Sequence, residues 1–282
     1  MNDNNTTPIK RTVLDADDIM HLVPALKGKY RLVNTLLHLL KMDKVNKLHS
    51  DNCDTPGAPF VAGVLRDLNI SKRIDNEEIL DEMVKKGAFI TVSNHPFGAL
   101  DGVTLIDTVA SRNPRYKVMV NLILNYISAM RPNFIAVDPF ATNDPEKRAI
   151  TMKGIREAMS LVREGVPVGF FPAGAVSKIT TNLRIEDRKW QPSIIRIIKQ
   201  LKVPVVPIYF HGHNSLIYNI LGLISWKIRT LRLPSEVFLK RGKTIHISVG
   251  EPIMPEEIAK FDDIDELGEF LKQKTYSMRE WK

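Results

Sequence analysis

The spacing of apolar residues along the chain changes near residue 87. Upstream of this point apolar positions recur at helical intervals, most clearly over residues 30–49, which predicts an N-terminal segment of helices. Downstream, short runs rich in β-branched and aromatic residues alternate with helical patterns. The runs predict strands at residues 88–93, 116–120, 134–137, 166–172, 203–210 and 244–249.

Helices are predicted between these strands. The clearest one begins at Asp144 and Pro145, a capping residue followed by a proline in the first turn, and continues to Val162. Alternating strands and helices are typical of an α/β domain, and apolar runs such as residues 203–208 favour strands covered on both faces. We therefore predict an α/β fold with a mixed central sheet flanked by helices over residues 81–282. A helical segment, residues 1–80, precedes it and could face a membrane.

The composition is that of an ordinary globular chain of 282 residues, 44% of them hydrophobic. The single cysteine, Cys53, excludes an internal disulfide framework, and residues 1–8 are polar and lack the order of a signal peptide. Both features favour a reducing, cytoplasmic compartment. No apolar run approaches the roughly 20 residues that span a bilayer. The net charge of +8 indicates an anionic partner, which could be nucleic acid, anionic lipid or an acidic carrier protein.

A histidine and an aspartate follow the first strand predicted after residue 87. His95 lies directly after residues 88–93, and Asp101 lies at the predicted start of a helix over residues 101–110. Ligand sites of open α/β sheets gather at the carboxyl ends of strands. A carboxylate that holds one ring nitrogen of a histidine makes the other nitrogen a general base for a hydroxyl proton. A histidine that only caps the helix or holds the turn is the alternative.

Two further segments follow predicted strands. Residues 169–178 (Gly-Phe-Phe-Pro-Ala-Gly-Ala-Val-Ser-Lys) end in a turn of small residues, which lets main-chain N–H groups approach a ligand. A tight turn with nothing bound is the alternative. Residues 203–215 begin with Val-Pro-Val-Val-Pro and end with two histidines, an asparagine and a serine.

The order and spacing of these three segments resemble those of the glycerolipid acyltransferase superfamily. Its members carry Asn-His followed after four residues by Asp, then Phe-Pro-Glu-Gly, then Val-Pro-Val-Val-Pro. The corresponding segments here are 94–101, 171–174 and 203–207, and Gly250, Pro252 and Ile253 are similar to a Gly-x-Pro-Ile run after the last strand. The resemblance covers about residues 87–253 and implies an acyltransferase.

The resemblance also implies a mechanism. His95 would deprotonate the acceptor hydroxyl, which attacks the thioester of an acyl carrier protein or coenzyme A, while Asp101 orients the imidazole. No acyl-enzyme, metal or other cofactor is expected. The oxyanion would be stabilised by main-chain donors within residues 96–99 or 173–175. The residues expected to bind substrate are Asn94, Pro96, Phe97, Gly98, Phe171, Pro172, Ala173, Gly174, Ser177, Lys178 and Arg184.

Three positions depart from the family pattern. Five residues, not four, separate His95 from Asp101, and Gly98 is the natural place for the extra residue to bulge. Ala173 replaces the glutamate of the common motif, and Val137 lies where an arginine usually follows Phe-Ile-x. The family uses these two positions for glycerol phosphate, so their loss argues against that headgroup.

The altered pattern resembles a bacterial branch, often labelled haemolysin-like, that is related to O-acyltransferases of lyso-ornithine and lyso-glycine lipids. We therefore expect a lyso-aminolipid acceptor. Formation of phosphatidic acid from 1-acylglycerol 3-phosphate is the alternative within the same chemistry, and an inactive lipid-binding relative is another. Four basic residues could bind the phosphate of 1-acylglycerol 3-phosphate as an alternative anion site, or could simply be solvated surface charge. They are Lys178, Arg184, Arg188 and Lys189.

A substrate with long acyl chains requires contact with a membrane. Residues 217–233 mix apolar side chains and Trp226 with Arg229 and Arg232, which is typical of an interfacial segment. Residues 30–49 could serve likewise, although a helix packed on the core is more common. We expect a peripheral enzyme on the cytoplasmic face of the inner membrane, at an anionic lipid surface.

Two other classes of function have less support in the sequence. A zinc hydrolase could assemble His95, Asp101, His211 and His213, but no His-Glu-x-x-His or paired-cysteine spacing is present. A nucleic-acid binder would account for the charge, but the basic residues are spread along the chain without interleaved aromatic residues. We expect neither a metal site nor nucleic-acid binding.

Overall fold

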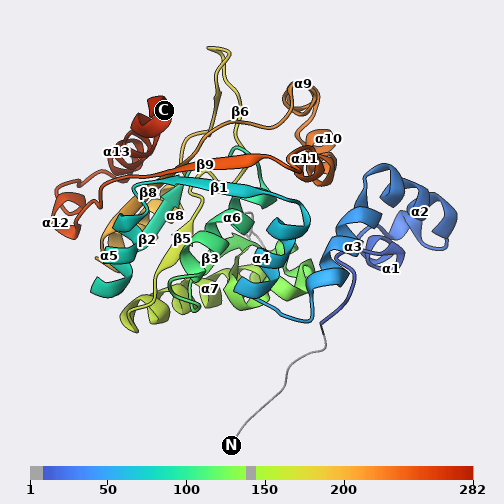
Figure 1. Cartoon of the computed structure of the whole chain (residues 1–282), viewed down its shortest axis with the longest axis horizontal. Coiled ribbons are helices and arrows are strands. Elements are labelled where there is room, and N and C mark those ends of the chain that lie inside the picture. Colours follow the sequence, from blue (N-terminus) through green and yellow to red (C-terminus); the bar gives the residue numbers. More distant parts are fainter. Residues whose placement is uncertain (1–8, 138–143, 282) are drawn as a thin grey trace, which may run out of the picture.

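A mixed seven-stranded sheet forms the centre of the protein in a computed structural model that describes residues 9–137 and 144–281 (Figure 1). Its strands are β1 (Ser71–Asp75), β2 (Ile90–Ser93), β3 (Lys117–Asn121), β4 (Phe134–Val137), β5 (Val168–Phe170), β8 (Val205–Phe210) and β9 (Thr244–Val249). The order across the sheet is β1-β9-β8-β2-β5-β3-β4. β9 and β1 run antiparallel to the other five strands, which are parallel to one another.

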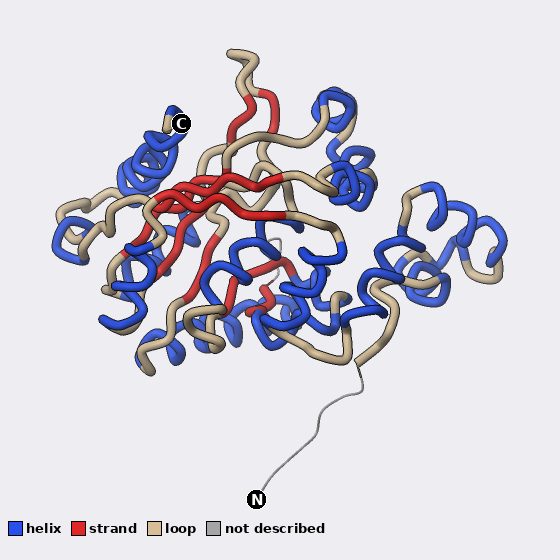
Figure 2. The backbone as a smooth tube through the Cα atoms, in the orientation of Figure 1, coloured by secondary structure: helices blue, strands red, loops and turns tan. Residues whose placement is uncertain are grey.

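Helices cover both faces of this sheet, and Figure 2 shows the strands between them. One hydrophobic core joins the sheet to α4 (Ala58–Asp67), α5 (Glu78–Lys86) and α6 (Ala99–Ala110). A second core joins the opposite face to α7 (Pro145–Arg163), α8 (Pro192–Leu201) and α13 (Ile264–Tyr276). The remaining helices after β8 are α9 (Leu216–Ile224), α10 (Trp226–Leu231), α11 (Leu233–Leu239) and α12 (Pro255–Ile258).

The central strands are buried on both sides because successive side chains point to opposite faces of the sheet and helices cover both faces. In β8, Val206, Ile208 and Phe210 enter the first core, whereas Val205 enters the second. Every residue of β8 is buried. The predicted α/β class, with a mixed sheet flanked by helices, is therefore confirmed.

The N-terminal helices stand beside the α/β core (Figure 1). They are α1 (Ala16–Leu22), α2 (Tyr30–Leu39) and α3 (Met42–Asn52), and a small apolar cluster of Ala16, Met20 and Val33 holds α1 and α2 together. The single helix predicted over residues 30–49 is wrong, since Lys41 adopts a left-handed conformation (φ 59°) at the turn between α2 and α3. Residues 1–8, whose polar composition argued against a signal peptide, lie outside the described residues.

The predicted strands all occur, with their ends shifted by up to two residues, and the helix predicted from Asp144 starts at Pro145. Two further features were not predicted from the sequence: β1 and a small hairpin formed by β6 (Lys178–Ile179) and β7 (Ile185–Glu186). β1 and α4 belong to the segment predicted as N-terminal and helical, yet they pack in the α/β core. The predicted boundary between residues 80 and 81 falls inside α5.

Candidate active site

A turn between β2 and α6 brings His95 and Asp101 together. Gly98 adopts a positive φ of 81° directly before α6, and a Cβ atom there would lie 2.9 Å from Leu233 Cδ2. Only glycine takes such a conformation readily, so Gly98 accommodates the longer spacing between the histidine and the aspartate. Asp101 Oδ2 accepts hydrogen bonds from the main-chain N–H groups of Phe97 (2.8 Å) and Gly98 (2.9 Å), which fixes the carboxylate at the start of the helix.

The imidazole of His95 lies against this fixed carboxylate. His95 Nδ1 is 2.9 Å from Asp101 Oδ2, and the Asp101 side chain is fully buried, whereas 19% of the His95 side chain is exposed. Burial raises the pKa of Asp101, an effect that His95 and the N–H groups of Phe97 and Gly98 oppose. The two atoms are close but are not aligned as a hydrogen bond. The carboxylate can still attract a proton on Nδ1 and leave Nε2 as the basic atom.

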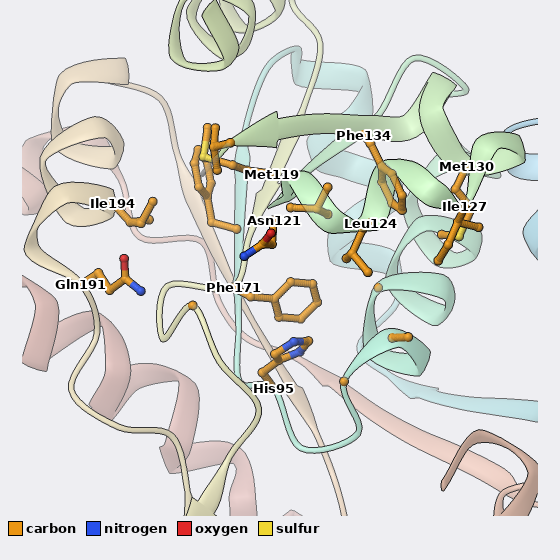
Figure 3. A pocket seen from close by; sticks show the side chains of 17 residues that line it. His95, Met119, Asn121, Leu124, Ile127, Met130, Phe134, Phe171, Gln191 and Ile194 are labelled. Atoms are coloured by element: carbon orange, nitrogen blue, oxygen red, sulfur yellow. The ribbon is translucent and has the colours of Figure 1, made fainter. Parts of the chain in front are cut away.

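A cavity of about 150 Å³ lies beside His95 (Figure 3). The ring of Phe171 packs against the imidazole with the centroids 4.4 Å apart. Most of the wall is apolar, and among the described residues that form it the polar side chains besides His95 are the neutral amides of Asn121 and Gln191. The apolar lining residues are Met119, Val120, Leu124, Ile127, Met130, Phe134, Val137, Phe170, Phe171 and Ile194.

A second buried carboxylate, that of Asp187, holds the main chain around His95. Asp187 Oδ1 accepts hydrogen bonds from His95 N (3.2 Å) and Ser177 Oγ (2.6 Å), and Oδ2 accepts one from Trp190 Nε1 (3.2 Å). Ser177 N in turn donates to His95 O at 2.8 Å. Burial raises the pKa of Asp187, while the Ser177 hydrogen bond and the nearby His95 act against the rise. His95 is thus fixed at its main chain as well as at its ring.

Asp187 was not predicted as a site residue from the sequence. Its flanking residues, Glu186, Arg188 and Lys189, make the segment typical of a solvated surface, yet Asp187 itself is 2% exposed. The sequence contains one indication that Asp187 is buried. Trp190 is three residues away, and the N–H of a buried tryptophan requires an acceptor.

The residues expected to bind substrate fall into two groups. Gly98, Phe171 and Gly174 line the cavity with His95. Asn94 is buried and exchanges two hydrogen bonds with the main chain of Phe210, at 2.7 Å and 2.9 Å, so it ties β2 to β8. Besides Asn94, the expected residues that do not line the cavity, as far as the structure describes it, are Pro96, Phe97, Pro172, Ala173, Ser177, Lys178 and Arg184.

The four basic residues considered as an alternative anion site have different surroundings. Arg188 Nε donates to the carbonyl of Ala173 at 2.7 Å, and Lys189 forms an ion pair with Asp265. Lys178 begins the β6 strand, and Arg184 precedes β7 in the same hairpin. None of the four lines the described cavity beside His95.

Three of the main-chain donors expected to stabilise an oxyanion are engaged inside the protein. The N–H groups of Phe97 and Gly98 donate to Asp101, and that of Gly174 donates to Phe171 O at 2.9 Å. Proline at position 96 has no N–H group. The positive end of α6, at Ala99, remains beside His95 on the cavity wall, where it favours negative charge.

The segment expected to be interfacial forms α9 and α10, which expose a cluster of apolar side chains. Its members are Leu216, Ile217, Ile220, Leu223, Ile224, Trp226, Ile228 and Leu231, called the α9–α10 patch below. Arg229, expected at the interface, is instead buried and donates to the carbonyls of Val176 and Ser177. Arg232 pairs with the buried Glu236. Across residues 9–137 and 144–281, no helix has both the length and the apolar character required to cross a bilayer.

The histidines weighed as zinc ligands do not assemble with His95 and Asp101. Within the described part of the chain, one group of three possible ligands lies close together, and it consists of Asp75, His211 and His246. His213 instead lies 2.7 Å from the carbonyl of Asn214 through Nδ1. A hydrolytic zinc centre at the His95 cavity is therefore not supported by the geometry.

Comparison with known proteins identifies a family and relatives that match most of the chain. A family model described as acyltransferase matches residues 20–281. A lyso-glycine lipid O-acyltransferase of Bacteroides thetaiotaomicron is 24% identical over 94% of this chain and 97% of its own length, and one of Phocaeicola vulgatus is 25% identical over 94% and 95%. A crystal structure of the 1-acyl-sn-glycerophosphate acyltransferase of Thermotoga maritima aligns with a TM-score of 0.47 and 17% identity, covering 78% of this chain and 80% of that one.

Proposed function

Since the chain belongs to the acyltransferase family, we propose that it moves a fatty acyl group from an acyl thioester to the hydroxyl of a lyso-lipid. His95, which lines an apolar cavity and lies against the buried Asp101, carries this function. The names of the two bacterial relatives, which refer to acylation of lyso-glycine lipid, support the acceptor class.

The reaction proceeds by direct transfer. His95 Nε2 takes the proton of the acceptor hydroxyl, and the oxygen attacks the thioester carbonyl to form the new C–O bond. The positive end of α6 at Ala99 stabilises the oxyanion of the tetrahedral intermediate. When the C–S bond breaks, the imidazolium returns its proton to the departing thiolate. Asp101 stabilises the imidazolium and keeps the ring oriented throughout.

The cavity accommodates part of the acyl group next to the thioester. Its volume of about 150 Å³ is below the roughly 300–1,000 Å³ of a site for a whole drug-sized ligand. The apolar wall formed by Met119, Leu124 and Met130 suits methylene groups, whereas the remainder of each lipid lies outside the cavity. The cavity thus positions the reacting carbonyl rather than enclosing both substrates.

The preferred acceptor is a lyso-aminolipid, such as a lyso-glycine or lyso-ornithine lipid. No lysine or arginine is among the described residues that line the cavity, so a phosphate close to the reacting hydroxyl would have no cationic partner there. Asn121 and Gln191 offer neutral hydrogen-bonding groups, which suit the amide of an aminolipid. Val137, at the position where the family pattern has arginine, also lines the cavity.

The acyl donor is an acyl carrier protein or coenzyme A thioester. Both carry negative charge, and the net charge of +8 attracts them to the protein. The enzyme needs no metal or cofactor for the transfer itself and works as a peripheral protein on the cytoplasmic face of the inner membrane.

The α9–α10 patch is the surface that meets the membrane. Leu223, Ile224 and Trp226 have 66%, 71% and 66% of their surface exposed. The patch is next to the turn between β2 and α6, called the catalytic turn below. Arg229 on α10 donates to the carbonyl of Ser177, and the N–H of Ser177 donates to His95 O. Contact therefore brings the mouth of the site to the lipid surface, and apolar burial rather than arginine charge drives it.

The acyl-transfer proposal is tested with purified protein, labelled acyl carrier protein or acyl-coenzyme A, and three acceptors: lyso-glycine lipid, lyso-ornithine lipid and lysophosphatidic acid. The His95→Ala variant should lose product formation by at least about 100-fold, while His213→Ala, a histidine that does not line the cavity, should stay active. Equal product from wild type and His95→Ala would reject the general base. Preference for lysophosphatidic acid would reject the aminolipid acceptor, and no product with any acceptor from folded protein would favour an inactive lipid-binding relative.

The membrane surface is tested by sedimentation with vesicles of phosphatidylethanolamine and phosphatidylglycerol. Replacing both Leu223 and Ile224 with glutamate should release the protein from vesicles, whereas Leu183→Glu, a change at an apolar residue 85% exposed in the β6–β7 hairpin, should not. Binding that persists in the double variant would assign the contact to another surface, for which α2, with Leu36 and Leu39 exposed, is the next candidate.

A further inference from the structure

Two histidines and a carboxylate meet on the three strands at one edge of the sheet. Asp75 ends β1, His246 lies in β9, and His211 directly follows β8. These strands are neighbours in the order β1-β9-β8, with Asp75 opposite Ser248 and with His211 N donating to His246 O at 3.0 Å. Residues far apart in the sequence are thereby fixed close together by the main chain of the sheet.

The polar atoms of this group converge. The imidazoles of His211 and His246 stack with their centroids 4.0 Å apart, and His246 Nε2 contacts Asp75 Oδ2. Ser248 Oγ is 2.8 Å from His211 Nε2 and 3.0 Å from Asp75 Oδ2. One ligand atom from each of Asp75, His211 and His246 lies within 4.8 Å of the others. The side chains of Asp75 and His246 are about one fifth exposed, so an ion can reach them from solvent.

We propose that Asp75, His211 and His246 bind a divalent transition-metal ion of the Zn²⁺ type. Two imidazole nitrogens and one carboxylate oxygen are a ligand set that Zn²⁺ accepts, with water as the fourth ligand. Tetrahedral Zn²⁺ with ligands at about 2.0–2.2 Å separates neighbouring ligand atoms by roughly 3.3–3.6 Å. The ligand atoms, now within 4.8 Å of one another, therefore draw together by up to about 1.5 Å, and the two rings turn out of their stack as the ion binds.

Binding requires a ring lone pair from each histidine. A neutral imidazole presents its unprotonated nitrogen to the ion once its proton lies on the other ring nitrogen, and the Asp75 oxygen that now contacts His246 Nε2 binds the ion instead. Ser248 keeps its position between His211 and Asp75, where its hydroxyl can orient a ligand oxygen. The hydrated ion releases water as the three protein ligands bind, and the neutral rings lose no proton in the exchange.

The site stabilises the fold and takes no part in acyl transfer. Its ligands come from positions 75, 211 and 246, so the unfolded chain does not hold them together, and an ion that binds only the folded state raises its stability. The ion would join the edge strand β1 to β8 across β9. His95 and Asp101 are not members of the group, so loss of the metal should leave the catalytic base in place.

The test uses tag-free, chelator-treated full-length protein titrated with Zn²⁺ by calorimetry and with Co²⁺ by visible absorption. We expect one ion per chain, Co²⁺ bands typical of a four-coordinate site with nitrogen ligands, and a melting temperature that rises with Zn²⁺. Affinity should fall at least about tenfold in His211→Ala, His246→Ala and the nearly isosteric Asp75→Asn. His213→Ala, the neighbouring histidine outside the group, should bind as wild type does.

Each outcome decides for or against the site. A wild-type protein whose melting temperature does not respond to Zn²⁺ would overturn the proposal, as would equal affinity in wild type and His246→Ala. Asp75→Asn preserves the size of the side chain, so reduced affinity in this variant, with an unchanged circular dichroism spectrum, would separate ligand loss from misfolding.

Discussion

Asp187 offers a quantitative test of how the catalytic turn is held. In Asp187→Asn the amide oxygen can remain on the side of His95 N and Ser177 Oγ, where Asp187 Oδ1 now accepts two hydrogen bonds. The amide NH₂ then faces Trp190 Nε1, so two donors oppose each other where one hydrogen bond of 3.2 Å exists in the native protein. The main-chain hydrogen bonds of Asp187, to Tyr276 and from Lys272, are unaffected.

The loss of stability in Asp187→Asn follows from these two opposed donors. A buried donor without an acceptor costs about 1–3 kcal/mol, and removal of a buried charge offsets part of it, so we expect the free energy of unfolding to fall by about 1–2 kcal/mol. Adding Trp190→Phe removes the opposing N–H, so the two changes should be less than additive by about 1 kcal/mol. A shift of the His95 main chain should also lower kcat about tenfold to a hundredfold with little change in KM.

Urea unfolding followed by circular dichroism gives the four free energies of the double-mutant cycle, and steady-state acyl transfer gives kcat and KM. Asp265→Asn, a change at an exposed carboxylate paired with Lys189, is the control and should alter stability by less than about 1 kcal/mol. If the two changes at Asp187 and Trp190 add within about 0.3 kcal/mol, or Asp187→Asn retains wild-type kcat, the assigned role of Asp187 is wrong.

Three other predictions test separate parts of the structure. Asp101→Asn keeps an oxygen at the Oδ2 position and removes the charge, so kcat should fall about 100-fold while the fold is retained; unchanged kcat would contradict the pairing with the base. Burial lowers the pKa of His49 below its ordinary 6.5, so the unfolded chain binds more protons and stability should be lost as pH falls through 6.5. Urea unfolding at pH 7.5 and 5.5 measures this loss of stability, which should be smaller in His49→Gln. Equal pH dependence in the wild type and His49→Gln would refute the assignment of this loss to His49. In Gly169→Ala the new Cβ would lie 2.1 Å from the hydroxyl oxygen of the buried Tyr116, so the free energy of unfolding should fall by about 1–3 kcal/mol. Gly102→Ala, with open space around the Cβ, is the control and should not lower it. Equal stability of the two variants in urea unfolding would show that Tyr116 moves aside to accommodate the methyl group.

Strands buried on both faces were predictable because their sequences are apolar throughout. β1 was not, since Ser71, Lys72 and Arg73 give it the composition of a surface loop. Its position explains this composition, because an edge strand with charged side chains resists pairing with other chains. The turn at Lys41 could not be predicted either, since the apolar spacing continues through it and no glycine or proline marks it.

Within the candidate site, local contacts were predictable and distant ones were not. His95 and Asp101 are close in sequence, and a strand followed by a glycine-containing turn was enough to predict that they meet. Asp187 and Arg229 contact the segment around His95 from positions 92 and 134 residues further along the chain. Asp187 lies in a charged segment that looks solvated in sequence alone, and Arg229 lies in a segment predicted to be interfacial. Their roles depend on how the sheet and helices bring these segments together, which local patterns do not encode.

The buried Arg229 limits how this enzyme can be recombined with its relatives. Its guanidinium donates hydrogen bonds to the carbonyls of Val176 and Ser177. These bonds hold the helices of the α9–α10 patch to the loop beside His95, so the two parts depend on each other for their position. A chimaera that exchanges α9 to α11 to change membrane preference should therefore exchange residues 173–190 with them. Transfer of the helices alone would leave two loop carbonyls without donors and loosen the catalytic turn.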